Sequence, residues 1–200
     1  MKLRSTLAAL GLCAFAAGTA FAAPVYYFAN LNGGNENPPN PSLGVGTSLL
    51  TIDTVLNTLR VEVMFSGLTG NVSAAHIHCC VAQPGNVGVA STTPSFPGFP
   101  SGGTSGSYDL LFDMTLASSY NPAFVTANGG TIASAFTALV SGLDLGRAYF
   151  NIHTSALTGG FPGGEIRGFF AIPEPGSLAL LIGGLGLLTL RSRRSKAAAA

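Results

Sequence analysis

The chain has 200 residues, of which 47% are hydrophobic and 8% are charged, and its net charge is +1. Nine Lys and Arg against eight Asp and Glu cannot form the basic surface that phosphate neutralisation requires, so we predict no nucleic-acid partner. The composition also excludes an acidic disordered tail. Apolar residues and cations are concentrated at the two ends, so the totals do not describe the middle of the chain.

The first 22 residues have the features of a secretory signal peptide. Lys2 and Arg4 precede an apolar run over residues 7–17, and the small residues Ala20 and Ala22 follow it. A charged start, an apolar centre and a small-residue cleavage site are typical of exported proteins. We therefore expect signal peptidase to cleave after Ala22; the alternative is a retained membrane anchor.

The last part of the chain, residues 173–200, combines three features in a fixed order. Pro173, Glu174 and Pro175 come first, an apolar Gly-rich run over residues 177–190 follows, and four cations lie within residues 191–196. As a helix, the run covers about 21 Å, less than the ~30 Å hydrocarbon core of a membrane. A stable membrane span is therefore not expected.

This order resembles the PEP-CTERM sorting signal of Gram-negative bacteria, with Pro173, Glu174 and Pro175 as the sorting motif. An exosortase-like membrane protease recognises and removes such signals. The resemblance implies transient insertion into the inner membrane, followed by release to the cell surface or the extracellular matrix. Exopolysaccharide or other surface proteins are the partners expected there.

Residues 23–172 are long enough for one domain with one hydrophobic core. This middle part holds seven acidic and three basic residues, a net charge of −4, so the positive charge of the whole chain comes from its ends. We divide the chain into a signal peptide (1–22), one domain (23–172) and a sorting segment (173–200).

The first half of the domain has the residue pattern of β-strands. A β-prone aromatic run at 25–28 leads into a cluster of turn residues at 32–41. Strands are predicted at 47–52 and 59–65, and the second of these alternates apolar and polar residues with period two. The short segment between these two strands is expected to join them as a hairpin.

The centre of the domain is predicted to contain three more strands and a long loop. A strand is expected at 72–80 and a short one at 87–90. The Pro-, Gly- and Ser-rich segment 93–106 predicts an exposed loop, and the alternation over 108–114 predicts a half-buried strand.

The last part of the domain predicts one helix and two strands. Apolar residues recur at helical spacing over 131–143 after a candidate cap at Thr131, and strands are expected at 148–154 and 164–171. Many short strands separated by turns predict a mainly β fold, an antiparallel Greek-key-like sandwich or barrel with one short helix. Hydrophobic targeting helices are expected at the N- and C-terminal ends.

The three histidines all lie on predicted strands. Side chains alternate between faces along a strand, so His76 and His78 share one face, and Cys80 continues the same row. If the strand that carries His153 is adjacent, these four residues offer nitrogen and sulfur ligands suited to zinc or copper. The alternative is a polar patch in which the histidines bond to backbone groups or carboxylates. A carboxylate that orients them would have to come from Glu165 or Asp144.

The adjacent pair Cys79 and Cys80 has three interpretations. The two residues are the only cysteines left after removal of a signal peptide, and an oxidising environment favours a disulfide. Neighbouring Cα atoms lie ~3.8 Å apart, below the usual range for a disulfide, so such a ring would be strained. Metal ligation by Cys80 and buried or free thiols are the alternatives.

Glu165 and Arg167 are two positions apart on a predicted strand and so share a face. We interpret them as a structural charge pair. A catalytic role for Glu165 is the weaker interpretation, because general acid–base catalysis normally needs a second titrating partner. The sequence contains no phosphate-binding Gly loop, nucleophile elbow or Cys/His hydrolase spacing, so no catalytic residue is predicted.

Several motifs together resemble the CHRD domain, which is named for its repeats in chordin. They are Leu31-x-Gly33-x-x-Glu36-x-Pro38-Pro39, Phe65-Ser66-Gly67-Leu68, Ala74-Ala75-His76-Ile77-His78, Tyr149-Phe150-Asn151-Ile152-His153-Thr154 and Pro162-Gly163-Gly164-Glu165-Ile166-Arg167-Gly168. The resemblance covers residues 25–172 and implies an extracellular β-rich module without an established enzymatic activity.

Two details qualify this resemblance. Glycine and other small residues follow the His-Ile-His motif in many CHRD domains, so Cys79 and Cys80 depart from the commoner pattern. Gly67-Leu68 ahead of His76-Ile77-His78 is also similar to the copper-binding strand of Cu/Zn superoxide dismutase, but the other ligands of that family are not evident. We therefore expect a non-catalytic surface or matrix protein, with copper or zinc binding as the alternative function.

Overall fold

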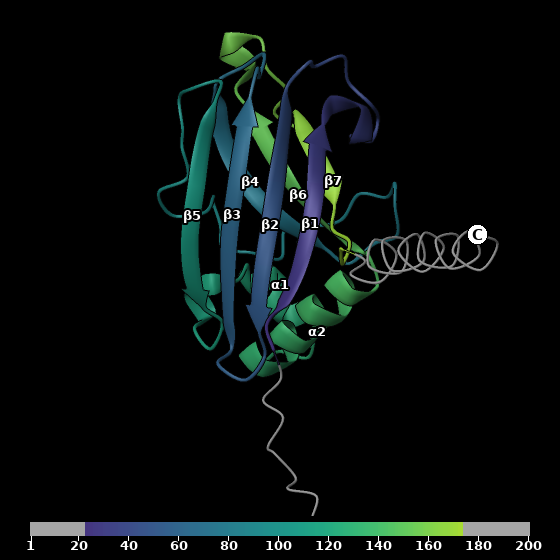
Figure 1. Cartoon of the computed structure of the whole chain (residues 1–200), viewed down its shortest axis with the longest axis vertical. Helices are drawn as coiled ribbons and strands as arrows, with labels where there is room; N and C mark the ends of the chain where they lie inside the picture. The colour runs from purple at the N-terminus through teal and green to yellow at the C-terminus, as the bar shows by residue number, and fades with distance from the viewer. Residues whose placement is uncertain (1–22, 174–200) are drawn as a thin grey trace, which may run out of the picture.

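The computed structural model describes residues 23–173 (Figure 1). The predicted signal peptide, the apolar run of the predicted sorting segment and the two expected targeting helices lie outside these residues. The described part contains seven strands: β1 (Val25–Asn32), β2 (Val45–Asp53), β3 (Thr58–Ser66), β4 (Val72–Cys79), β5 (Gly106–Asp113), β6 (Ala148–Thr154) and β7 (Ile166–Phe169). It also contains the helices α1 (Pro122–Ala127) and α2 (Ile132–Asp144) and the 3₁₀ turns η1 (Gly33–Asn35), η2 (Ala117–Ser119) and η3 (Ala156–Thr158).

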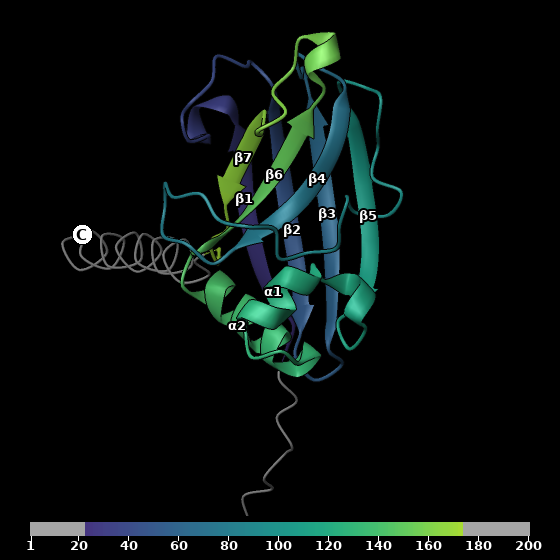
Figure 2. The ribbon, with the colours of Figure 1, turned by 180° about the vertical axis from the view of Figure 1, so that it is seen from behind.

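The strands form one antiparallel sheet in the order β4-β6-β7-β1-β2-β3-β5. The sheet curls into a half-barrel, with β5, β3, β2 and β1 on one side and β7, β6 and β4 on the other (Figures 1 and 2). Both helices lie across one end of it. The predicted mainly β, antiparallel fold is thus confirmed, in the form of a single curled sheet.

The predicted hairpin between β2 and β3 is confirmed. Asp53 pairs with Thr58, and the Asp53 carboxylate accepts the N–H groups of Val55 and Leu56 at 2.8 and 2.9 Å. Asn57 has a φ of 52°, a left-handed conformation that asparagine tolerates better than most residues. The turn sets the register that directs alternate residues of β3, from Leu59 to Phe65, into the core.

The core fills the inside of the curl, and the segment between β4 and β5 helps to close it. Phe96 stacks on Phe150 with centroids 5.8 Å apart, and Phe99 stacks on Phe65 at 5.7 Å. The N–H of Val72 donates to the Gly103 carbonyl at 2.9 Å, which ties this segment to the edge strand β4. The prediction of an exposed loop at 93–106 was therefore wrong for Phe96 and Phe99, which are 3% and 7% exposed.

The predicted strand at 87–90 was also wrong, because only an isolated bridge joins Val89 to His78 there. Gly85 and Gly88 interrupt the segment. The Val87 carbonyl accepts a bond from the His78 ring instead of from a neighbouring strand. The segment thus covers β4 as a loop rather than extending the sheet.

The predicted helix is confirmed as α2, and a second helix was missed. The Thr131 side chain accepts the N–H of Ser134 at 3.1 Å in a capping box, as its position before the apolar pattern indicates. The shorter α1 begins after Asn121, which caps it, with Pro122 in its first turn. Asn-Pro is a helix-start signal that the sequence offered. No helix within residues 23–173 is long and apolar enough to cross a membrane.

Candidate metal centre

The structure brings the three histidines together on neighbouring strands. β4 and β6 are antiparallel partners, with His76 opposite Asn151 and Ala74 opposite His153. Because Ile77 of β4 and the residues beside His153 point into the core, the histidines lie on the outer face of the sheet. Two loops cover this face, so His76 and His78 are only 7% and 8% exposed.

The three imidazole rings converge on one point. One ring nitrogen of each histidine lies within 4.8 Å of a ring nitrogen of each of the other two. The ring centroids of His76 and His153 are 5.4 Å apart, and His78 lies 5.9 Å from both. The rings are inclined to one another rather than stacked, which suits nitrogens that point to a common centre.

Each ring donates one N–H group to a backbone carbonyl of a covering loop. These bonds join His76 Nε2 to Pro94 (2.7 Å), His78 Nδ1 to Val87 (2.8 Å) and His153 Nδ1 to Pro162 (2.9 Å). A carbonyl oxygen only accepts, so the bonded nitrogen carries the proton and the other nitrogen of a neutral ring carries a lone pair. Backbone carbonyls therefore orient the three rings. From the sequence, Glu165 or Asp144 had been the only candidates for this role. Asp144 instead accepts the Tyr27 hydroxyl at 2.6 Å.

The remaining nitrogens, His76 Nδ1, His78 Nε2 and His153 Nε2, are buried and have no hydrogen-bond partner. Burial lowers the pKa of all three imidazoles and brings that of His78 to about 4, because the charged form loses its hydration. The rings are therefore neutral at pH 7. Three neutral rings with convergent lone pairs form a set of ligands for a metal ion.

Cys80 is not part of this ligand set, although its place in the sequence put it in the same row as the histidines. β4 ends at Cys79, so the alternation of side chains stops there. Cys80 is joined to Cys79 by a disulfide, and a side chain on Gly142 of α2 would collide with both sulfur atoms. The disulfide therefore packs against α2 and not toward the histidines.

Glu165 and Arg167 do not form the predicted charge pair. Glu165 precedes β7, after Gly164 with a φ of 135°, and its carboxylate accepts the Thr154 hydroxyl at 2.5 Å. Arg167 lies opposite Asn151, on the histidine face, and its ion-pair partner is Glu36 at 3.7 Å. The turn at Gly164 breaks the strand alternation from which the pairing was predicted, so the two charges point to opposite faces.

Arg167 ties two loops to the sheet beside the histidine face, and one of them is the covering loop that carries Val87. Its guanidinium is fully buried and lies over the Tyr149 ring, 4.9 Å from the centroid, while Tyr149 stacks on His78 at 4.8 Å. It donates to Asn35 O (2.5 Å), Asn86 Oδ1 (2.6 Å) and Pro84 O (2.8 Å). These partners belong to two different loops, so one side chain connects both loops to β7.

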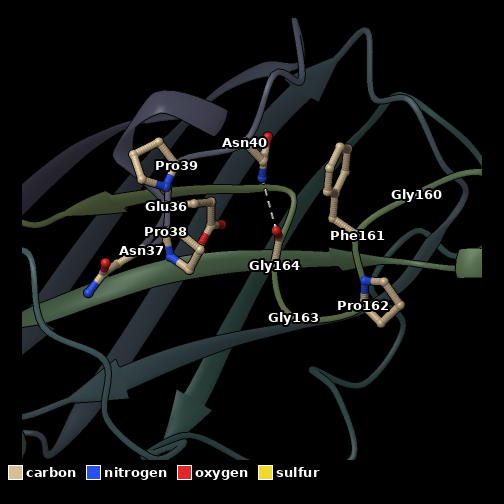
Figure 3. Close-up of a pocket in the computed structure, with 10 residues that line it drawn as sticks. All are labelled: Glu36, Asn37, Pro38, Pro39, Asn40, Gly160, Phe161, Pro162, Gly163 and Gly164. Carbon is tan, nitrogen blue, oxygen red and sulfur yellow. Dashed lines mark hydrogen bonds between the residues drawn. The ribbon is translucent and has the colours of Figure 1, made fainter.

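A surface pocket of about 310 Å³ opens beside this arrangement (Figure 3). Its lining combines Glu36 and neighbouring residues 37–40 with residues 160–164, and Asn40 Nδ2 donates to the Gly164 carbonyl across it at 3.2 Å. Burial raises the pKa of Glu36 to about 7, although the charge of Arg167 acts to lower it. Glu36 was not predicted as a site residue, and the only signal for it was its place in the Leu-x-Gly-x-x-Glu motif.

The fold and the site define a class of protein: a curled antiparallel β domain with a covered histidine cluster on its outer face. The family model of the CHRD domain matches residues 27–170, so the chain belongs to the CHRD-domain family, as the motifs indicated. The family supports a non-catalytic domain. No curated protein and no solved structure matches the chain.

Proposed function

We propose that this protein is an exported CHRD-domain protein that binds one zinc or copper ion through His76, His78 and His153. The observation that carries the proposal is the cluster of three histidines, whose ring nitrogens lie within 4.8 Å of one another and each of which has one buried nitrogen without a partner. Buried polar atoms in folded proteins nearly always have a partner, and imidazole nitrogen is the commonest metal ligand. The carbonyl bonds to the opposite nitrogens are the outer interactions that orient histidine ligands in metal sites.

The spacing of the three nitrogens suits a tetrahedral ion after a small movement. Zinc–nitrogen bonds of 2.0–2.1 Å place two tetrahedral ligand atoms about 3.4 Å apart. The observed nitrogens lie within 4.8 Å of one another, so each pair closes by at most about 1.4 Å, which small side-chain rotations supply. Copper accepts the same imidazole ligands, so the choice between the two metals is made by experiment.

We expect the full-length protein to bind one equivalent of zinc or copper and His153→Ala to weaken that binding by more than about 100-fold. Removing an outer-shell partner already costs 10–100-fold in affinity, and loss of a ligand costs more. His153 is the best single target because it is the least buried of the three histidines. Elemental analysis and calorimetric titration with each metal measure the effect.

Two variants serve as controls for this experiment. Glu62→Gln changes a carboxylate on a different strand, and the double variant Cys79→Ser with Cys80→Ser removes both sulfur atoms; both should bind metal as the wild type does. A wild-type protein without stoichiometric metal, or full affinity in His153→Ala, would contradict the proposal.

Export and sorting form the second half of the proposal. Its support is the order of a signal-type segment at 1–22, a CHRD domain, and a Pro-Glu-Pro, apolar and basic segment at 173–200. Signal peptidase and an exosortase-like protease are the processing partners, with transient insertion into the inner membrane between the two cleavages. The released domain then resides at the cell surface or in the extracellular matrix, with exopolysaccharide or other surface proteins.

Replacing Pro173, Glu174 and Pro175 by alanine is expected to keep the C-terminal segment on the protein and to retain the protein in the membrane fraction. The wild-type chain, in a bacterium that carries an exosortase, should lose a tag placed after Ala200 and appear outside the cell. Fractionation with mass measurement of both ends distinguishes these outcomes. A full-length wild-type chain with both ends intact in the cytosol would rule out the sorting proposal.

A further inference from the structure

The buried atoms without partners are concentrated at the histidine face. Within residues 23–173 six buried side-chain atoms lack a hydrogen-bond partner, and only Ser48 Oγ lies elsewhere. The other five are His76 Nδ1, His78 Nε2, His153 Nε2, Asn151 Oδ1 and Glu36 Oε1. An ion held by the histidines accounts for three of them and leaves Asn151 and Glu36 unexplained.

The strand register places Asn151 in the middle of the cluster. His76 is directly opposite Asn151. His78 lies two residues to one side of this pair and His153 lies two residues to the other side, so the backbones of His78 and His153 are about 13 Å apart along the strands. Their ring centroids are nevertheless only 5.9 Å apart. Both rings therefore lean inward over the pair formed by His76 and Asn151. The point at which an ion would bind thus lies over Asn151.

The carboxamide of Asn151 is also next to Glu36. A Cβ atom added to Gly164 would lie 2.6 Å from Asn151 Nδ2, 2.8 Å from Asn151 Oδ1 and 2.8 Å from Glu36 Oε1, so these atoms surround one point. The amide has a donor and an acceptor at opposite sides of one carbon. In the structure neither Asn151 Oδ1 nor Glu36 Oε1 has a hydrogen-bond partner, so no bond to Glu36 occupies the amide oxygen.

We propose that Asn151 is the fourth protein ligand of the metal site, with Oδ1 bound to the ion beside the three imidazole nitrogens. This inference rests on the proposed metal-binding function. Glu36 is then a positioning residue, because its carboxyl would accept a hydrogen bond from Nδ2 once Oδ1 turns to the ion, and so would hold the amide in that orientation. Asn151 is 3% exposed, so no bulk water competes for its oxygen. The assignment gives a role to both atoms that an ion on three histidines leaves without a partner.

The test compares Asn151→Ala and Asn151→Asp in the full-length protein, with Co²⁺ as a spectroscopic probe and Zn²⁺ in competition titrations. Asn151→Ala is expected to weaken Zn²⁺ binding by more than about 100-fold, because loss of a ligand costs more than loss of an outer-shell partner, and to change the visible Co²⁺ spectrum. Asn151→Asp keeps an oxygen at this position and should restore the affinity. Asn30→Ala, an exposed asparagine on β1, is the matched control and should bind as the wild type does.

The outcomes separate this inference from the proposed function. Wild-type affinity and an unchanged Co²⁺ spectrum in Asn151→Ala would overturn the role of Asn151 and leave the three-histidine site in place. A wild-type protein that binds neither Co²⁺ nor Zn²⁺ would overturn the proposed function itself. The unfolding midpoint of metal-free Asn151→Ala should stay close to that of the wild type. A fall in this unfolding midpoint large enough to explain the affinity loss would make Asn151 a structural residue and overturn the inference.

Discussion

Arg167→Met is expected to lower the free energy of unfolding by about 3–5 kcal/mol, the usual cost of removing one member of a buried ion pair. Methionine keeps much of the apolar stem of arginine but has no cationic donor. Glu36, buried 3.7 Å from the guanidinium, loses its ion-pair partner, and the carbonyls of Asn35 and Pro84 lose donors. Urea unfolding of the purified protein, followed by tyrosine fluorescence, measures the change.

A matched control separates burial from charge. Arg60 makes ion pairs with Asp109 at 2.6 Å and Glu62 at 3.4 Å, but its side chain is 46% exposed. Arg60→Met should therefore cost less than about 1 kcal/mol. If Arg167→Met proved as mild as Arg60→Met, Arg167 would not be the connection between the loops and the sheet that its contacts indicate.

Arg167 also matters for the metal site, because the loops that it holds include the one that carries Val87, the acceptor for His78. Loosening this loop removes one of the bonds that fix the imidazole orientation. We therefore expect any Arg167→Met protein that folds to bind metal more weakly, although Arg167 does not belong to the ligand set.

Glu165→Gln is expected to destabilise the protein by about 3 kcal/mol at pH 7, the value of one or two hydrogen bonds to a charged acceptor. The fully buried carboxylate accepts two hydroxyl groups, from Ser42 and Thr154, and two backbone N–H groups, from Thr69 and Gly70. Glutamine places an NH₂ group where one oxygen had accepted, so donors face donors. Denaturant unfolding at several pH values measures the loss.

The pH dependence of this effect has a definite sign. Burial acts to raise the pKa of Glu165, but its four hydrogen bonds outweigh burial and leave the pKa below the ordinary value. A lowered pKa means that the carboxylate stabilises the fold above about pH 4.3, the unfolded value, and that this stabilisation is lost as the pH falls through the folded value.

The difference in the free energy of unfolding between the wild type and Glu165→Gln should therefore be largest near pH 7 and become smaller toward pH 3. Glu62→Gln, at a partly exposed carboxylate, should change stability by less than about 1 kcal/mol at either pH. A gap that stayed constant over this range would show that the ionised form of Glu165 is not what stabilises the turn before β7.

Much of the fold and part of the site were predictable because they depend on local patterns. The period-two alternation of β3, the capping position of Thr131 and the shared face of His76 and His78 follow from backbone geometry within a few residues. The CHRD motifs were recognisable for the same reason, and the family match over residues 27–170 confirms them. Where local geometry changed, at Gly164 and after Cys79, the alternation argument placed Glu165 and Cys80 on the wrong face.

The composition of residues 93–106 predicted a loop but not where its side chains lie. Residues 93–106 are rich in Pro, Gly and Ser, as loops are, yet Phe96 and Phe99 enter the core because the curled sheet leaves space between its edge strands. Glu36 and Arg167 are more than a hundred residues apart in sequence. Their pairing depends on β7 lying next to β1, which no local pattern reveals.

By itself, the sequence determined that the middle of the chain is an antiparallel β domain and that two histidines face the same way, because strand geometry is a property of consecutive residues. Only the tertiary structure decided that His153 joins them, that carbonyls of two loops fix all three rings, and that Asn151 lies opposite His76 on the neighbouring strand. These features depend on contacts between distant segments, and burial of those contacts is what leaves the three ring nitrogens neutral and free to bind a metal ion.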